Sequence, residues 1–311
     1  MSGVVIVGAG QAGSSCAAKL RALGYDGDVT LIGDEPVLPY QRPPLSKKYL
    51  LGEMDLERLY LRPESFYADN NITLRLGERV SGLDAVSKHV QIGETTLAYD
   101  HLVLTTGSFP RMLPVEMGGH LEGVYLVRDL ADVDKMAPEF RDGAHVLVVG
   151  GGYIGLEGAA VAAEKGLRVT LIEAADRILQ RVAAPETSDF FRDLHRGHGV
   201  EVREGAKLET LLGDGRVSGA RLTDGSEMAV DFVVVGIGIA PATALAEAAG
   251  AQIDDGIKVD DQGQTSVAGI WAAGDCASFP HAEGRLRLES VPNAIDMAAC
   301  VAENIMGAAK T

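Results

Sequence analysis

A short pattern that occurs twice constrains this chain more than any other feature of its sequence. An apolar run rich in β-branched residues is followed by a glycine-rich hexapeptide and then by an alanine-rich stretch. The first copy has VVIV at 4–7 and GAGQAG at 8–13, and the second has VLVV at 146–149 and GGGYIG at 150–155. Each copy is predicted to place a tight turn between a buried strand and the start of a helix.

Apolar runs at 29–32 and 169–172 follow the two helical stretches, so each hexapeptide lies in a strand–helix–strand unit. In that context G-x-G-x-x-G is the dinucleotide-binding fingerprint: the first glycine makes the turn, the second lets backbone approach the pyrophosphate, and the third lets helix and strand pack closely. The helix N-terminus adds amide donors and partial positive charge. We therefore predict an α/β protein with two Rossmann-like dinucleotide-binding domains, each with a parallel sheet and right-handed crossovers.

Carboxylates follow the second strand of both units. Glu173 stands about twenty residues after the second glycine turn, where a carboxylate would accept hydrogen bonds from both ribose hydroxyls of NADH. Arg177 and Arg181 are close enough in sequence to keep NADPH as an alternative. In the first unit Asp34 is the expected ribose contact and Glu35 is its neighbour, although both could simply belong to a solvated acidic loop.

Charge and cysteine content exclude several classes of protein. The net charge of −16 argues against nucleic acid or an anionic membrane as a partner, because either would need a basic face. No apolar stretch approaches the roughly 20 residues needed to span a bilayer, and no basic segment precedes the first strand, so a cytoplasmic location is expected. Cys16, Cys276 and Cys300 form no C-x-x-C pair, so we expect no disulfide framework, no redox dithiol and no metal site.

The order of the remaining elements predicts one domain inserted in the other. Runs at 102–107 and 232–236 are expected to be the strands that close the two sheets. The elements after residue 240 contain no fingerprint of their own, so we expect them to return to the first domain. The first domain is then discontinuous, residues 1–110 and 241–311, and the second occupies residues 111–240.

A third motif resembles a known family. Residues 265–275, TSVAGIWAAGD, match the fingerprint that ends in Gly-Asp in the flavoproteins typified by glutathione reductase. Within that family the chain is most similar to the NADH-dependent ferredoxin reductases of bacterial oxygenase systems, through PYQRPPLSK at 39–47, GGGYIGLE at 150–157, GIG at 236–238 and ESVPNA at 289–294. The resemblance implies FAD in the first domain and NADH in the second.

The resemblance also implies the residues of each site. The implied FAD contacts are Gly8, Gly10, Ala12, Gly13, Asp34, Glu35, Arg42, Lys47, Val80, Thr106, Gly107, Arg128, Gly274, Asp275, Val291 and Pro292. The implied NAD contacts are Gly150, Gly152, Tyr153, Ile154, Gly155, Glu173, Arg181, Gly236, Ile237 and Gly238. Lys47 and Glu157 are the implied catalytic pair near flavin N5. A helix over 293–306, beginning near Pro292, would direct its N-terminus at the pyrimidine end of the flavin. Tyr153 could cover the flavin or pack in the core.

The activity implied is hydride transfer from NADH to FAD, followed by transfer of single electrons to a [2Fe-2S] ferredoxin that serves an oxygenase. Disulfide reductases of the family have cysteine on the helix that passes the flavin, whereas this chain has Leu45-Ser46-Lys47-Lys48 there. Alternatives are an NADH oxidase, a rubredoxin or quinone reductase, and a non-enzymatic NADH-sensing flavoprotein.

Two departures from the family pattern are visible. Family members continue into a C-terminal interface domain, whereas this chain stops at Thr311, so that domain is expected to be absent and the docking of the acceptor and the oligomeric state stay open. The family's usual A-T-G at the end of the run at 102–107 is Thr105-Thr106-Gly107 here.

Overall fold

The computed structural model describes residues 3–311, which divide into two compact units. One contains the chain up to Gln41 with Tyr60–Phe109 and Pro241–Thr311, and the other contains Arg42–Leu59 and Pro110–Ala240. Residues 42–59 therefore lie in the second unit, whereas the sequence placed them in the first domain. The reason is local packing, because the kinked helical segment η1 (Leu45–Tyr49) lies against a helix of the second unit.

The first unit is built on a seven-stranded sheet. Its strands are β1 (Gly3–Val7), β2 (Val29–Gly33), β3 (Ile72–Leu76), β4 (Val80–Asp84), β5 (His89–Ile92), β6 (Thr95–Leu104) and β18 (Ile270–Ala272). The order is β3-β2-β1-β6-β5-β4, with β18 also paired to β6 in parallel. The first half of β6 pairs antiparallel with β5 and its second half pairs parallel with β1 and β18. The expectation that this strand closes the sheet is wrong, because β18 pairs with its second half and the hairpin strand β5 pairs with its first half.

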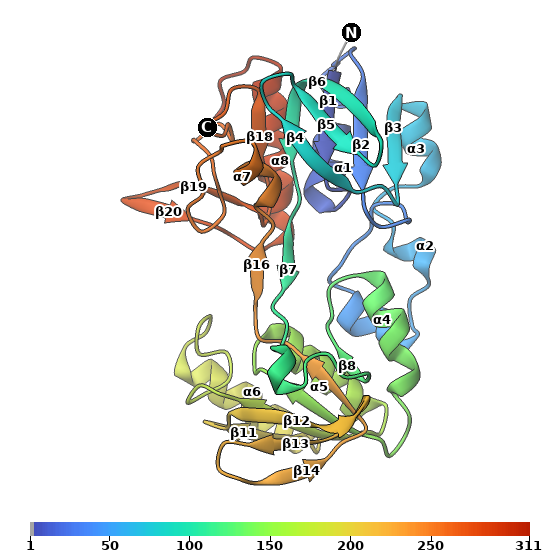
Figure 1. Cartoon of the computed structure of the whole chain (residues 1–311), viewed down its shortest axis with the longest axis vertical. Coiled ribbons are helices and arrows are strands. Elements are labelled where there is room, and N and C mark those ends of the chain that lie inside the picture. Colours follow the sequence, from blue (N-terminus) through green and yellow to red (C-terminus); the bar gives the residue numbers. More distant parts are fainter. Residues whose placement is uncertain (1–2) are drawn as a thin grey trace. The chain divides into compact units, whose positions relative to one another are not determined.

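Alternate residues of these strands enter two separate cores. Val4, Ile6 and Leu31 face the helices α1 (Gln11–Ala22) and α8 (Val291–Ile305), which contact each other along one face of the sheet (Figure 1). Val5 and Val7 face the opposite core, which includes β4, β5 and the helix α7 (Ala244–Ala248). Both faces of β1 are therefore buried, which is typical of strands in a parallel sheet.

The second unit has a five-stranded parallel sheet in the order β11-β10-β9-β15-β8. Its strands are β8 (Val124–Tyr125), β9 (His145–Val149), β10 (Arg168–Glu173), β11 (Glu201–Glu204) and β15 (Phe232–Val235). The helices α5 (Tyr153–Glu164) and α6 (Pro185–Gly197) pack on its strands (Figure 1). The strand β15 lies between β9 and β8, so the expectation that it closes this sheet is also wrong.

An antiparallel sheet that the sequence did not predict covers part of the second unit's core. It consists of β12 (Leu208–Asp214), β13 (Arg216–Leu222) and β14 (Glu227–Ala229). Its inner residues, such as Leu211 and Val217, share a core with Leu147 and Val233 of the parallel sheet. The alternating polar residues of its strands face solvent, as expected for a sheet with one buried face.

The other elements are short and serve mainly as connections. They are α2 (Leu56–Leu59), α3 (Glu64–Asp69), β7 (Ser108–Pro110), η2 (Val115–Met117), α4 (Leu130–Met136), η3 (Ala137–Glu139), β16 (Ile239–Pro241), β17 (Ile257–Lys258), β19 (Ala277–His281) and β20 (Gly284–Leu286). Asp129 caps α4 in a capping box, and Ser290 caps α8 by accepting from the amide of Asn293. Pro292 lies in the first turn of α8, where a missing N–H costs nothing.

Candidate functional site

The three glycines of the first turn have different surroundings. Gly8 has a φ of +114°, and a Cβ there would lie 2.1 Å from the carbonyl oxygen of Thr105. A Cβ on Gly13 would lie 2.0 Å from the carbonyl oxygen of Gly8. By contrast, no atom lies within 4 Å of a Cβ built on Gly10. The first and third glycines are thus required by packing, and the second faces the open space in which a pyrophosphate would be held.

The second turn repeats this arrangement. A Cβ on Gly150 would lie 2.3 Å from the carbonyl oxygen of Gly236, and one on Gly155 would lie 2.0 Å from that of Gly150. No atom lies within 4 Å of a Cβ on Gly152. Gly10 and Gly152 are the N-cap residues of α1 and α5, so no capping side chain competes for the amides of the first helical turn. Both turns fit a phosphate group.

The Gly-Asp motif lies beside the first glycine turn. Gly274 follows β18, and a Cβ on it would lie 3.1 Å from the Cβ of Ala12 and 3.8 Å from that of Ala294. The first turn of α8, with Val291 and Pro292, is therefore next to the start of α1. Asp275 is half-buried and accepts a hydrogen bond from Ser108 Oγ at 3.2 Å. Sequence reasoning missed Ser108, although a serine two residues after Thr106 is a possible signal.

The two threonines after β6 have different partners. Thr105 Oγ1 donates to the carbonyl oxygens of Gly8, at 2.8 Å, and Val7, at 3.1 Å. Thr106 Oγ1 donates to the carbonyl oxygen of Ala242 at 2.7 Å, and Gly107 has a φ of +68°. Thr105 is the position where the family has alanine, so the departure adds a hydroxyl that stabilises the turn at Gly8.

The predicted ribose contacts of the first unit lie just after β2. Asp34 is exposed, whereas Glu35 is half-buried and accepts from Tyr40 Oη at 2.5 Å. Val80, the first residue of β4, is buried and belongs to the same core as Val7. These residues and the two motifs above lie near the carboxyl ends of parallel strands, the edge where ligands bind in doubly wound sheets.

Four predicted residues gather around η1 in the second unit. Lys47 Nζ lies 2.8 Å from Glu157 Oε2 on α5, so the predicted catalytic pair is an ion pair. Arg42 Nη1 donates to the carbonyl oxygen of Arg128 at 2.7 Å. Ser46, which the sequence marked only as a position without sulfur, donates to the same Glu157 oxygen at 2.5 Å.

Glu173 lies at the end of β10 and bonds to the second glycine turn. Its Oε2 accepts from the amide of Gly151 at 2.6 Å, and its Oε1 accepts from that of Ala175 at 2.8 Å. Arg177 donates to Ser188 Oγ at 2.5 Å and to the carbonyl oxygen of Gln180 at 3.3 Å. Arg181 is exposed on the same loop.

The segment after β15 completes this edge of the second sheet. The amide of Gly236 donates to the carbonyl oxygen of Val149 at 2.8 Å, and a Cβ on Gly236 would lie 3.3 Å from the amide nitrogen of Gly155. Ile237 is 38% exposed, and Gly238 has a φ of +102°. Gly236 is thus a packing glycine against the start of α5, while the two residues that follow it, Ile237 and Gly238, can contact a ligand.

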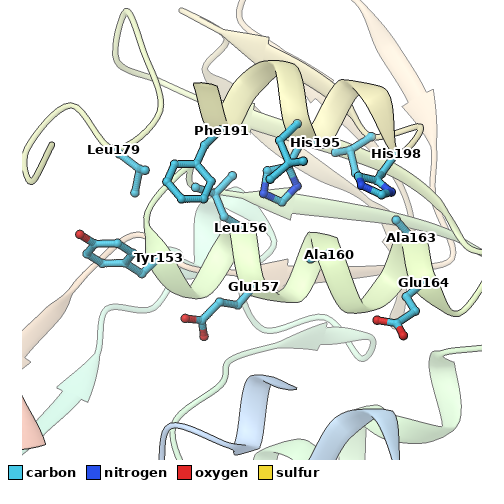
Figure 2. A pocket seen from close by; sticks show the side chains of 12 residues that line it. Tyr153, Leu156, Glu157, Ala160, Ala163, Glu164, Leu179, Phe191, His195 and His198 are labelled. Atoms are coloured by element: carbon cyan, nitrogen blue, oxygen red, sulfur yellow. The ribbon is translucent and has the colours of Figure 1, made fainter. Parts of the chain in front are cut away.

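A groove of about 600 Å³ lies between α5 and α6, with largely apolar walls (Figure 2). Tyr153 lies at one end of the groove and His198 at the other, and the Glu157 side chain points away from α6. Tyr153 is 59% exposed, which rules out the expectation that it packs in the core. His195 is buried in the groove, and burial lowers its pKa.

The three cysteines lie apart as free thiols. Burial raises the pKa of Cys16 to about 12 and also raises the pKa of Cys276 and of Cys300. Within residues 3–311, no group of three or more histidine, cysteine, aspartate or glutamate side chains could hold a metal ion. Over the same residues, no helix combines the length and apolar character needed to cross a membrane.

Comparisons with known proteins agree with this geometry. Residues 2–298 match the family described as pyridine nucleotide-disulphide oxidoreductase. The chain is 46% identical over 313 residues to a ferredoxin–NAD(P)(+) reductase of Sphingomonas sp, covering 98% of this chain and 75% of the relative. It is 40% identical over 308 residues to a rubredoxin–NAD(+) reductase of Pseudomonas putida, covering 98% and 80%. A crystal structure of the covalent putidaredoxin reductase–putidaredoxin complex aligns with a TM-score of 0.95 at 41% identity, covering 98% of this chain and 75% of that one.

Proposed function

Because the chain belongs to the pyridine nucleotide-disulphide oxidoreductase family, we propose that it is an NADH-dependent ferredoxin reductase that binds FAD and NADH and reduces a [2Fe-2S] ferredoxin of an oxygenase system. The observation that carries the proposal is the repeated packing of the two glycine turns, each with its second glycine open to space. Two turns of one geometry are expected in a protein that binds two dinucleotides.

In this proposal the first unit holds most of the FAD. The open face of Gly10 and the amides of the first turn of α1 receive the pyrophosphate, and Asp275 accepts from the ribityl hydroxyls. The start of α8, which Ser290 caps, adds partial positive charge beside Ala12 and Gly274. Val80, Thr106 and Gly107 supply further contacts, and the resemblance to ferredoxin reductases implies Arg42, Lys47 and Arg128 as others.

The second unit holds the nicotinamide dinucleotide. Gly152 presents open space for its pyrophosphate, and Glu173, with both oxygens already fixed by backbone amides, accepts from the adenosine ribose. A carboxylate there repels a 2′-phosphate, and Arg177 is held by Ser188. Both features favour NADH over NADPH.

Lys47 and Glu157 act at the reacting end of the site. The bound flavin supplies the capacity to take a hydride and release electrons one at a time. Glu157 keeps the Lys47 ammonium in place, with 2.8 Å between Nζ and Oε2, and the ammonium would supply fixed positive charge to the reacting part of a bound flavin. No proton transfer by the protein is required for this role.

The acceptor is a one-electron carrier in this proposal. The segment Leu45–Tyr49 contains no cysteine, and the pKa of all three thiols is raised by burial, so a thiol relay is disfavoured. A rubredoxin is the second candidate, because a rubredoxin reductase is 40% identical to this chain.

Stopped-flow absorbance with NADH and with NADPH tests the proposal. We expect a yellow protein that NADH bleaches at least tenfold faster than NADPH does at equal concentration. The ratio follows because one hydrogen bond to a charged group contributes about 1.5 to 3 kcal/mol. Steady-state turnover with a [2Fe-2S] ferredoxin, a rubredoxin, a quinone and air then ranks the acceptors. A colourless protein, or peroxide as the main product, would overturn the proposal. We also propose a cytoplasmic location, which cell fractionation tests separately.

A further inference from the structure

Glu157 Oε2 accepts hydrogen bonds from two successive residues of η1. Lys47 Nζ lies 2.8 Å from this oxygen and Ser46 Oγ lies 2.5 Å from it. Ser46 is only 2% exposed, whereas the Lys47 side chain is 46% exposed and the Glu157 side chain 27%. The carboxylate therefore has one buried neutral donor and one charged donor that reaches from solvent.

The two donors contribute differently to the geometry. An ion pair between flexible, partly exposed side chains is weak, because it must hold many rotatable bonds in one arrangement. The Ser46 hydroxyl has a single side-chain torsion before it and is fixed by burial, so it can hold the carboxylate in one orientation. Lys47 Nζ also donates to the carbonyl oxygen of Pro43 at 3.1 Å. The ammonium therefore lies between two acceptors, and it keeps this position only as long as Glu157 keeps its own.

We propose that Ser46 is a positioning residue for the reductive step: its hydroxyl fixes Glu157, and Glu157 in turn fixes the Lys47 ammonium. The inference rests on the proposed function, since the ammonium matters only if it acts beside a flavin. Ser46 itself touches neither nucleotide in this proposal, so its removal changes the rate of flavin reduction rather than the binding of NADH.

The variant Ser46→Ala, measured by stopped flow with NADH, tests the inference. We expect the limiting rate constant for flavin bleaching to fall about tenfold, because that is the rate change that corresponds to the loss of one hydrogen bond to a charged group. The NADH dissociation constant from the same titration is expected to stay within twofold. Ser46→Thr, which keeps the hydroxyl, should restore most of the rate, and the exposed Ser65→Ala is the matched control.

A double-variant cycle separates positioning from a merely structural effect. If Ser46 acts through Glu157, adding Ser46→Ala to a Glu157→Gln background should change the rate less than twofold. The inference would be overturned if Ser46→Ala still lowered the bleaching rate tenfold in the Glu157→Gln background. It would also be overturned by a wild-type bleaching rate for Ser46→Ala, or by a slow rate for a well-folded Ser46→Thr. If Ser46→Ala does not retain FAD, Ser46→Cys, a weaker donor of similar size, is expected to be intermediate in rate, and a wild-type rate would again contradict it. A wild-type protein that NADH does not bleach would contradict the proposed function itself.

Discussion

The backbone amide of Gly151 donates a hydrogen bond to Glu173, with 2.6 Å between the amide nitrogen and Oε2. The second carboxylate oxygen accepts from the amide of Ala175, so one side chain joins the glycine turn after β9 to the loop after β10. A carboxylate offers about four acceptor sites, so two remain for ribose hydroxyls. The residue that would recognise the nucleotide is thus the one that holds the turn in place.

Removal of this carboxylate should weaken NADH binding and narrow the preference over NADPH. For Glu173→Ala we expect the KM for NADH to rise about tenfold or more, since hydrogen bonds to a charged group contribute about 1.5 to 3 kcal/mol. Steady-state kinetics with both nucleotides provide the measurement. Glu164→Gln, on the exposed side of α5, is the control and should leave both constants unchanged. An unchanged NADH to NADPH ratio for Glu173→Ala would contradict the assignment.

Alanine at the second glycine of each turn should separate the two nucleotide sites. Gly10 has φ −88° and Gly152 has φ −81°, and both have open space where a Cβ would be, so each variant should fold. Gly10→Ala is expected to lose FAD, whereas Gly152→Ala should keep FAD and bind NADH weakly. The flavin absorbance after gel filtration and an NADH titration measure these outcomes. Loss of FAD from Gly152→Ala but not from Gly10→Ala would reverse the assignment of the turns.

Thr105 should stabilise the first unit through its hydroxyl. Replacement by the family's alanine removes a donor shared by the carbonyl oxygens of Val7 and Gly8, for an expected loss of about 1 kcal/mol and of about 2 to 4 °C in Tm. Thermal melts of Thr105→Ala, Thr105→Ser and Thr96→Ala give the comparison, because Thr96 is an exposed threonine of β6, the strand that Thr105 follows. Equal melting temperatures for Thr105→Ala and Thr96→Ala would show that the hydroxyl contributes nothing.

The thiols should react slowly in the folded protein. Burial raises the pKa of Cys16 to about 12, and that of Cys276 and Cys300 is raised for the same reason, so little thiolate exists near neutral pH. We expect Ellman's reagent to label Cys300 first, because it is only half-buried, and all three thiols at once in denaturant. Cys276→Ser should reduce its flavin as fast as the wild type. A slower rate in that variant would revive a thiol relay.

Stability should fall on acidification, in part through His145. Burial lowers the pKa of this histidine below its ordinary value of about 6.5. The positive charge of Arg168 lowers the pKa further, whereas the hydrogen bond to the Ala229 carbonyl oxygen raises it. The unfolded chain therefore binds the proton first as pH falls. The stabilisation is present above about pH 6.5 and is lost as pH falls through the lowered folded-state value.

Melting temperatures at pH 7.5 and 5.5 check this prediction. The decrease should be smaller for His145→Gln than for the wild type, because one group with a lowered pKa has been removed. His120→Gln, at an exposed position, should keep the wild-type decrease. His101 and His195, whose pKa is also lowered by burial, should contribute to the decrease that remains. The same decrease in all three proteins would contradict a role for His145.

The sequence determined the parts of this protein that depend on local pattern. The turns at Gly8 and Gly150 could be predicted because each glycine fingerprint must stand between an apolar strand and a helix, and the structure has β1, α1, β9 and α5 there. The pairing of Lys47 with Glu157 was predicted through resemblance alone, since no local rule relates positions so far apart.

Tertiary packing alone decided the rest. The positions of β6 and β15 inside their sheets depend on which strands pair beyond them, and pairing is a non-local choice that no periodicity reports. The placement of residues 42–59 in the second unit follows from contacts of η1 with α5, not from composition. The hydroxyls of Ser46, Thr105 and Ser108 gained partners in the same way, because a polar side chain finds its acceptor only after distant backbone has come within hydrogen-bond distance of about 3 Å.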